Sequence, residues 1–312
     1  MHACRVATPA YRRPHVSLEH VGTGTEDHLS THTLIARLRE RFQRKLRKYR
    51  ARFEEKSRPV VIRNRGQCPI CERGATFVAR DRWLRDHYKC TRCSSIPRER
   101  ALMAVLQQRF PAWRTMTIHE SSPGKRGASK RLAKECPHYL PSHFYSDHPL
   151  GATVGRYRCE NLEQLTFADA SIDLHVTQDV FEHVLRPDRA FREIARTLKP
   201  GGAHVFTVPL VNKEQPSRMR VAVDATGAVQ HLEPPAYHGN PIDARGSLVT
   251  VDWGFDIRDY IADACGLDTE IIRIDDPDRG IRAEYIEVLV TTKPATVTQS
   301  PLHFSPRSPL IG

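Results

Sequence analysis

The stretch that decides the fold is IDLHVTQDVFEHVLRPDRAFREIARTLKPGGAHVFTV, residues 172–208. It opens with a nearly continuous apolar run at 172–177 and closes with a second one at 203–208. Between these runs, residues 187–198 carry apolar side chains at helical spacing, and two glycines follow at 201–202. Two buried strands joined by a helix are typical of parallel pairing, so this stretch predicts one unit of a parallel sheet.

The same alternation of strands and helices continues on both sides of this unit. Toward the N-terminus we expect a strand at 116–118, a turn at 120–124, a helix at 130–134, and strands at 143–146 and 156–159. Toward the C-terminus we expect a helix at 256–265 and strands at 271–274 and 285–291. The predicted fold class is therefore α/β, a Rossmann-like doubly wound and mostly parallel sheet over residues 111–294.

Four cysteines precede this region in two pairs, Cys68-Pro69-Ile70-Cys71 and Cys90-Thr91-Arg92-Cys93, with eighteen residues between the pairs. Each turn of this kind presents two thiolates to one side of an ion, and four thiolates close the tetrahedral shell of Zn²⁺ without an open position. We therefore predict a structural zinc in a small zinc-ribbon-like module at 60–110 that also contains a linker helix. An iron–sulfur or redox role is the alternative.

Charge is distributed unevenly along the chain. Residues 1–100 contain 24 Lys and Arg against 10 Asp and Glu, whereas residues 101–312 contain 24 against 26. Within the basic part, residues 33–57 predict an amphipathic basic helix whose apolar stripe packs on the domain that follows; docking to RNA or a membrane is the alternative. The stripe consists of Leu34, Leu38, Phe42, Leu46, Tyr49 and Phe53.

The two ends of the chain predict disordered tails, at 1–32 and at 295–312, because large apolar residues are few in both. Residues 1–30 contain no apolar run of the kind that a signal peptide needs, and the sequence has no apolar stretch long enough to span a membrane. In a reducing compartment, the two pairs of cysteines favour metal binding over disulfides. We therefore expect a cytoplasmic protein without a membrane span.

Three segments in register carry a resemblance to a known family: LEQLTFADASIDL at 162–174, VFEHV at 180–184 and LKPGG at 198–202. They resemble class I S-adenosylmethionine-dependent methyltransferases with a type 11-like methyltransferase domain. The resemblance covers about 180 of the 312 positions. It implies a Rossmann-like fold, S-adenosylmethionine as cofactor and transfer of its methyl group.

A dinucleotide-like cofactor in such a fold lies at the carboxyl ends of the parallel strands. Glu120, Ser122 and Gly124 occupy the first strand-to-helix turn, where backbone must approach the cofactor closely. Asp147 follows the second strand and is expected to accept hydrogen bonds from ribose hydroxyls. The turn departs from the family, because its usual Gly-x-Gly is Ser122-Pro123-Gly124 here.

The resemblance places further cofactor contacts after the third and fourth strands. Asn161, with Glu160 beside it, matches the residue that family members place against the adenine amino group. Gln178 and Asp179 match residues at the edge of the cofactor.

The adjacent pair Glu182 and His183 resembles a pair that positions the next helix in the family. For His183, packing and substrate contact both remain open.

The segment at about 211–254 is longer than a simple connection requires and predicts an insert that covers the substrate. His231 and His238 in this insert are the candidate general bases, since imidazole titrates near neutral pH; structural hydrogen bonding is the alternative for both. The expected reaction is methyl transfer to a small-molecule or glycan acceptor, driven mainly by proximity and orientation.

Two other functions compete with this prediction. One is methylation of ribosomal or transfer RNA, with the zinc module and basic N-terminus binding RNA. The other is a non-catalytic zinc-containing nucleic-acid-binding protein with a degenerate Rossmann core. The altered glycine turn is the feature that favours the latter.

Overall fold

A computed structural model describes residues 39–47, 49–50, 57–224, 226–240, 242–243 and 245–295. The chain divides into two units, Met1–Ser57 and Arg58–Gly312. In the first unit, residues 39–47 and 49–50 are helical, and packing of their apolar stripe stays a prediction. The tails predicted at 1–32 and 295–312 lie outside the described residues except for residue 295. Over the described ranges, none of the helices has the length and apolar character to cross a membrane.

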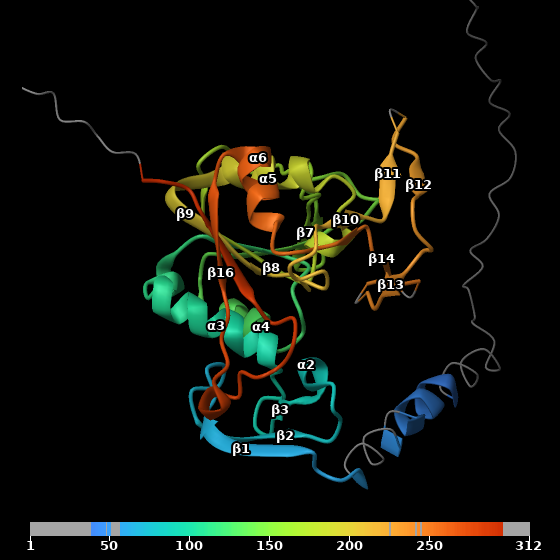
Figure 1. Cartoon of the computed structure of the whole chain (residues 1–312), viewed down its shortest axis with the longest axis vertical. Helices are drawn as coiled ribbons and strands as arrows, with labels where there is room; N and C mark the ends of the chain where they lie inside the picture. Colours follow the sequence, from blue (N-terminus) through green and yellow to red (C-terminus); the bar gives the residue numbers. More distant parts are fainter. Residues whose placement is uncertain are drawn as a thin grey trace, which may run out of the picture. The chain divides into compact units, whose positions relative to one another are not determined.

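The second unit is built on an eight-stranded sheet with the order β16-β17-β9-β8-β4-β5-β7-β6 (Figure 1). Its inner strands β7, β5, β4, β8 and β9 are parallel, whereas β6, β17 and β16 add to the two sides in antiparallel pairings. This arrangement confirms the predicted mostly parallel α/β sheet. The strands are β4 (Ile118–Ser121), β5 (Tyr139–His143), β6 (Thr153–Val154), β7 (Tyr157–Cys159), β8 (Ile172–Gln178), β9 (Leu198–Thr207), β16 (Asp268–Ile272) and β17 (Val288–Thr292).

Helices cover both faces of this sheet. Figure 1 shows α3 (Pro97–Arg109) and α4 (Gly127–Glu135) on one side and α5 (Pro187–Thr197) and α6 (Ile257–Cys265) on the other. Successive residues of β9 belong to two separate hydrophobic cores. Val205 packs in the core beneath α3 and α4, and Phe206 packs in the core beneath α5 and α6. A strand buried on both faces reads as a continuous apolar run, which explains the pattern at 203–208.

The strand predicted at 143–146 is wrong in position. The observed strand β5 ends at His143 and passes through Pro141, which pairs in register with Glu120 of β4. A proline lacks one N–H, but parallel strands bond alternate residues to each neighbour, so the ladder loses a single bond there. Residues 145–148 instead form a turn in which the His148 N–H donates to the Tyr145 carbonyl oxygen at 3.2 Å.

The four-cysteine segment forms a three-stranded antiparallel sheet in the order β1-β2-β3, with β1 (Ile62–Gln67), β2 (Gly74–Ala79) and β3 (Lys89–Cys90). The short helix α2 (Leu84–His87) connects β2 to β3, and α3 follows the second cysteine pair. Phe77 and Tyr88 of this module share one buried cluster with Leu102 of α3 and Val288 of β17. The module and the large sheet therefore have a common core.

The insert consists of three small two-stranded pairings, β10–β15, β11–β12 and β13–β14. Its first element follows β9, and its last element precedes α6. The strands are β10 (Arg218–Met219), β11 (Val221–Val223), β12 (Val229–His231), β13 (Tyr237–His238), β14 (Ser247–Leu248) and β15 (Val251–Asp252). Three short 3-10 helices complete the second unit, namely η1 (Trp113–Thr115), η2 (Phe181–His183) and η3 (Pro277–Arg279).

A row of three buried histidines crosses the centre of the sheet. His119 of β4, His175 of β8 and His204 of β9 lie in register on neighbouring strands. The Nδ1 atoms of His119 and His175 are 2.9 Å apart, and His204 Nε2 lies 3.0 Å from Thr177 Oγ1. Burial lowers the pKa of His119 and of His204 to about 3, and it lowers the pKa of His175 well below its usual value. The three imidazoles are therefore neutral near pH 7.

Acid is expected to destabilise the fold through this row. A histidine whose pKa is lower in the folded state than the unfolded value of about 6.5 stabilises the fold fully above that pH, and this contribution is lost as the pH falls below it. Each such histidine lowers the free energy of unfolding by up to about 1.4 kcal/mol per pH unit. Denaturant unfolding followed by circular dichroism from about pH 7 to about pH 4.5 should show this decline.

The contribution of the row is separated from that of other groups by two variants. His204→Asn should flatten the decline in the free energy of unfolding, because one buried imidazole is removed. His231→Asn alters an exposed histidine and should keep the wild-type decline. An unchanged slope in His204→Asn would show that the row does not control acid stability.

Candidate active site

A cavity of about 1010 Å³ lies at the carboxyl ends of β4 and β8. Strand β4 is the point where the sheet order reverses, since β5 pairs with it on one side and β8 on the other. In open α/β sheets, ligands bind in the crevice at such a point. The ends of the parallel strands and the loops that follow them contribute Ser121, Ser122, Gly124, His143, Phe144, Glu160, Asn161, Leu162, Gln178, Asp179 and Val180 to the lining.

The buried carboxylate of Glu120 ties these strand ends together. It accepts hydrogen bonds from Ser129 Oγ at 2.6 Å, from the Tyr139 hydroxyl at 2.6 Å and from Gln178 Nε2 at 2.8 Å. Ser129 Oγ in turn accepts a bond from the Gly124 N–H at 2.9 Å. Burial raises the pKa of Glu120, and the three donors oppose that rise. Glu120 thus fixes the turn and the Gln178 side chain from below the cavity.

The altered glycine turn keeps the backbone shape that a glycine would favour. Ser122 has a φ of +55°, in the left-handed region that few residues other than glycine adopt readily. Its N–H donates to the Ser142 carbonyl oxygen at 2.8 Å, which anchors the turn to β5. Gly124, two residues on, lines the cavity directly.

Glu160 and Asn161 both line the cavity where β7 ends. The buried Glu160 carboxylate is held by Arg158 Nε at 2.5 Å and by the Thr166 N–H at 2.9 Å. Asn161 Oδ1 accepts a bond from the Glu163 N–H at 3.0 Å. Glu160 therefore braces the loop, while Asn161 presents its amide at the wall.

Three predicted site residues do not line the cavity: Glu120, which holds the strand ends beneath it, and Asp147 and His231. The side chain of Asp147 is 79% exposed, lies 2.8 Å from His148 Nδ1 and is absent from the cavity lining. His231 is exposed on β12, where it pairs with Val221. Their predicted roles as ribose contact and general base stay predictions.

Asp179 lies in the cavity wall and is held by the four-cysteine module. Its carboxylate accepts hydrogen bonds from Arg85 Nη2 at 2.8 Å and Thr207 Oγ1 at 3.1 Å, and it lies 2.9 Å from Arg98 Nε. Although burial acts in the opposite direction, Arg85 and Arg98 hold the pKa of Asp179 below its usual value. Trp83, on the same module, also lines the cavity.

Sequence reasoning missed this contribution of the module to the cavity. It treated the basic part of the chain as a scaffold or an RNA-binding surface. The available signal was the position of Arg85 and Arg98 on either side of the second cysteine pair. Nothing in that spacing identifies Asp179, 81 positions after Arg98, as their partner.

Glu182, His183 and His238 also line the cavity. His183 Nδ1 lies 2.8 Å from the Leu248 carbonyl oxygen, and its Nε2 lies 3.7 Å from Glu182 Oε1. His238 Nδ1 lies 3.9 Å from the same carboxylate oxygen. Burial, together with the nearby Asp179 carboxylate, raises the pKa of Glu182 to about 8.

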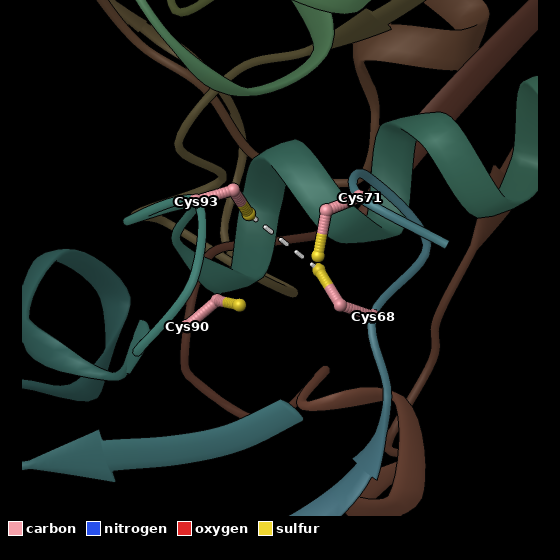
Figure 2. Close-up of side chains that lie close together, drawn as sticks. All are labelled: Cys68, Cys71, Cys90 and Cys93. Carbon is pink, nitrogen blue, oxygen red and sulfur yellow. Dashed lines mark hydrogen bonds between the residues drawn. The ribbon is translucent and has the colours of Figure 1, made fainter. Parts of the chain in front are cut away.

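The sulfur atoms of Cys68, Cys71, Cys90 and Cys93 lie within 4.8 Å of one another. Figure 2 shows the four side chains converging on a common centre, with Cys68 Sγ 3.7 Å from Cys93 Sγ. A disulfide requires about 2.05 Å, whereas a tetrahedral zinc with Zn–S bonds of about 2.3 Å places its sulfurs about 3.8 Å apart. The arrangement fits a tetrahedral metal ion.

Arg100 provides a buried positive charge beside these thiols. Its guanidinium donates to the carbonyl oxygens of Tyr88 at 2.8 Å and Gly280 at 2.6 Å, and also to that of Ser95. Gly280 has a φ of +68°, and a Cβ there would meet the Phe77 ring, so glycine is required for this approach. A divalent ion with four thiolates is anionic, and the Arg100 charge complements it.

Part of the chain is similar to known proteins. Residues 140–206 match the family described as a methyltransferase domain. Dimethylglycine N-methyltransferase of Parasynechococcus marenigrum (strain WH8102) is 29% identical over 133 residues, which are 36% of this chain and 44% of that protein. The chain therefore spans less than half the length of this curated relative.

Two solved structures illustrate similar folds. An S-adenosylmethionine-dependent methyltransferase from Mesorhizobium loti has 19% identity and a TM-score of 0.41, and the match covers 62% of this chain and 97% of that one. The 1,6-didemethyltoxoflavin-N1-methyltransferase of Burkholderia thailandensis, with its substrate and S-adenosylhomocysteine bound, has 13% identity and a TM-score of 0.38. That match covers 63% of this chain and 78% of that one.

The sheet order and the cavity at its reversal point are those of a Rossmann-like α/β fold, and residues 140–206 within it match a methyltransferase domain.

Proposed function

We propose that the chain transfers the methyl group of S-adenosylmethionine to a small-molecule or glycan acceptor bound beneath the insert. This proposal rests on one observation: a single cavity is lined both by the strand ends and by the insert. Strand-end loops line one side, and the insert lines the other. Its volume of about 1010 Å³ is at the upper end of the range for ligand sites, roughly 300–1,000 Å³, which leaves room for an acceptor beside the cofactor.

On the cofactor side, the proposed contacts are Ser122, Gly124, Asn161 and Gln178, because these residues line the cavity at adjacent strand ends. Glu120, Glu160 and Asp179 act by holding those loops in place, since their carboxylates are engaged by the chain's own donors. Asp147 remains outside this set.

On the acceptor side, the wall combines apolar and polar groups. Val211 and Ile242 are exposed apolar side chains that line the cavity, and Trp83 adds an indole ring. Asn240 and Ser247 supply hydrogen-bonding groups from the insert. Such a wall suits an organic acceptor with a few polar groups, and methyl transfer then requires mainly that the nucleophile be aligned with the sulfonium methyl. Of the two histidines predicted as general bases, only His238 is among the cavity-lining residues, where it could contact an acceptor.

We also propose that Cys68, Cys71, Cys90 and Cys93 bind one structural zinc. The spacing of the sulfurs and the adjacent Arg100 charge support it. Because the same module carries Arg85 and Arg98, the zinc would also stabilise the wall that holds Asp179.

Removal of one thiolate tests the zinc site. Cys90→Ser should lose zinc, melt at a lower temperature and bind S-adenosylmethionine more weakly, because the wall around Asp179 is loosened. Elemental analysis, thermal unfolding and calorimetry measure the three effects. Cys265→Ser changes a half-buried cysteine of α6 and should keep the zinc. Full zinc content and unchanged melting in Cys90→Ser would refute the assignment.

Methyl transfer is tested by following S-adenosylhomocysteine formation from S-adenosylmethionine. Calorimetry should first show one cofactor molecule bound per chain. Fractions of a cell extract are then supplied as acceptors, with low-molecular-mass compounds, glycans and RNA kept separate. Product should form with the low-molecular-mass or glycan fraction and not with RNA. Product formed only with RNA would contradict the proposed acceptor class, and lack of cofactor binding would contradict the activity itself.

A further inference from the structure

The Glu182 carboxylate is the least compensated polar group in the cavity wall. Its side chain is only 3% exposed, and within the described part of the chain neither of its oxygens has a hydrogen-bond partner. A buried carboxylate without a partner is costly, so a group that neutralises it is expected nearby. The nearest arginines, Arg85 and Arg98, are engaged by Asp179.

The tautomer of His183 is fixed by its neighbour. The Leu248 carbonyl oxygen accepts hydrogen bonds only, so the Nδ1 atom 2.8 Å away carries the proton. In the neutral imidazole, Nε2 then carries a lone pair, and it faces Glu182 Oε1 across 3.7 Å. Two lone-pair atoms face each other at a separation too long for a hydrogen bond. A metal ion fits between such atoms.

His238 completes the group from the insert. Its Nδ1 lies 3.9 Å from Glu182 Oε1, and its ring meets that of His183 edge to face with centroids 5.0 Å apart. The three ligand atoms lie within 4.8 Å of one another. A tetrahedral ion with bonds of about 2.1 Å separates its ligand atoms by about 3.4 Å, so only a small closure of the side chains is needed.

We propose that Glu182, His183 and His238 bind a divalent transition-metal cation inside the cavity, separate from the four-cysteine site. Two imidazoles and one carboxylate suit first-row metals and leave coordination positions open. The bond from His183 to the Leu248 carbonyl is the kind of outer contact that orients metal-binding histidines.

The open positions face the cavity, where an oxygen of the acceptor would bind. This role toward an acceptor rests on the proposed function, whereas metal binding does not. A cation would fix the orientation of an acceptor oxygen and stabilise negative charge on it. His238 would then serve as a ligand from the insert, which couples closure of this wall to assembly of the site.

Metal binding by the full-length protein tests the proposal directly. Protein carrying one zinc at the cysteines is titrated with Co²⁺, followed by gel filtration, elemental analysis and visible spectroscopy. One cobalt should bind per chain, with no change in zinc content and without a thiolate-to-cobalt band. His238→Ala should weaken cobalt binding more than tenfold, whereas His231→Ala, on the neighbouring exposed strand, should bind like wild type.

Three outcomes would overturn the proposal: no saturable cobalt binding, thiolate-bound cobalt alone, or equal binding by wild type and His238→Ala. His238 is half exposed, so this variant is expected to fold, and its circular dichroism spectrum checks that it does. Calorimetry with S-adenosylmethionine separates this proposal from the proposed function. Normal cofactor affinity without metal binding would overturn the metal site alone.

Discussion

The structure depends on the pairing of one partly buried carboxylate, Asp179, with two arginines of the four-cysteine module. Arg85 of α2 and Arg98 of α3 lie 2.8 and 2.9 Å from its oxygen, and both precede the first strand of the large sheet in the sequence. Loss of both arginines would leave a partly buried charge without an ionic partner, a change that costs up to about 3–5 kcal/mol. Through this pairing, the four-cysteine module forms part of the cavity wall.

The same pairing explains the environment of Glu182. Asp179 uses the nearby positive charge, and Glu182 lies three residues further along without a hydrogen-bond partner in the described structure. The carboxylates thus divide into two groups. Glu120, Glu160 and Asp179 are neutralised or hydrogen-bonded by the chain and stiffen the strand ends. Glu182 instead faces two imidazoles, His183 and His238, across the cavity wall.

The sequence predicts the central fold well because strands buried on both faces leave continuous apolar runs. The runs at 172–177 and 203–208 correspond to β8 and β9, and the helix between them begins at Pro187 as expected. The strand predicted at 143–146 instead lies at Tyr139–His143 and tolerates Pro141, because a proline disfavours a strand only where its missing N–H matters. Four convergent cysteines were also predictable, since metal-binding spacing is a local property of sequence.

The candidate site was less predictable because its decisive contacts join distant segments. Gln178 and Gly124 line the cavity, whereas Asp147 lies outside it. Arg98 and Asp179 are 81 positions apart, and His238 and Glu182 are 56 apart. No local sequence pattern predicts contacts between residues so far apart in the chain. They arise only when α3 and the insert pack at the same edge of the sheet.

The central claim is that the cavity between the strand ends, the module and the insert is where S-adenosylmethionine binds. A crystal structure of the protein with S-adenosylhomocysteine tests it most directly. The account predicts the ligand at the carboxyl ends of β4 and β8, against Gly124, Asn161 and Gln178, with its sulfur toward His183 and His238. Ligand bound elsewhere, or a cavity that stays empty at saturating ligand, would contradict it.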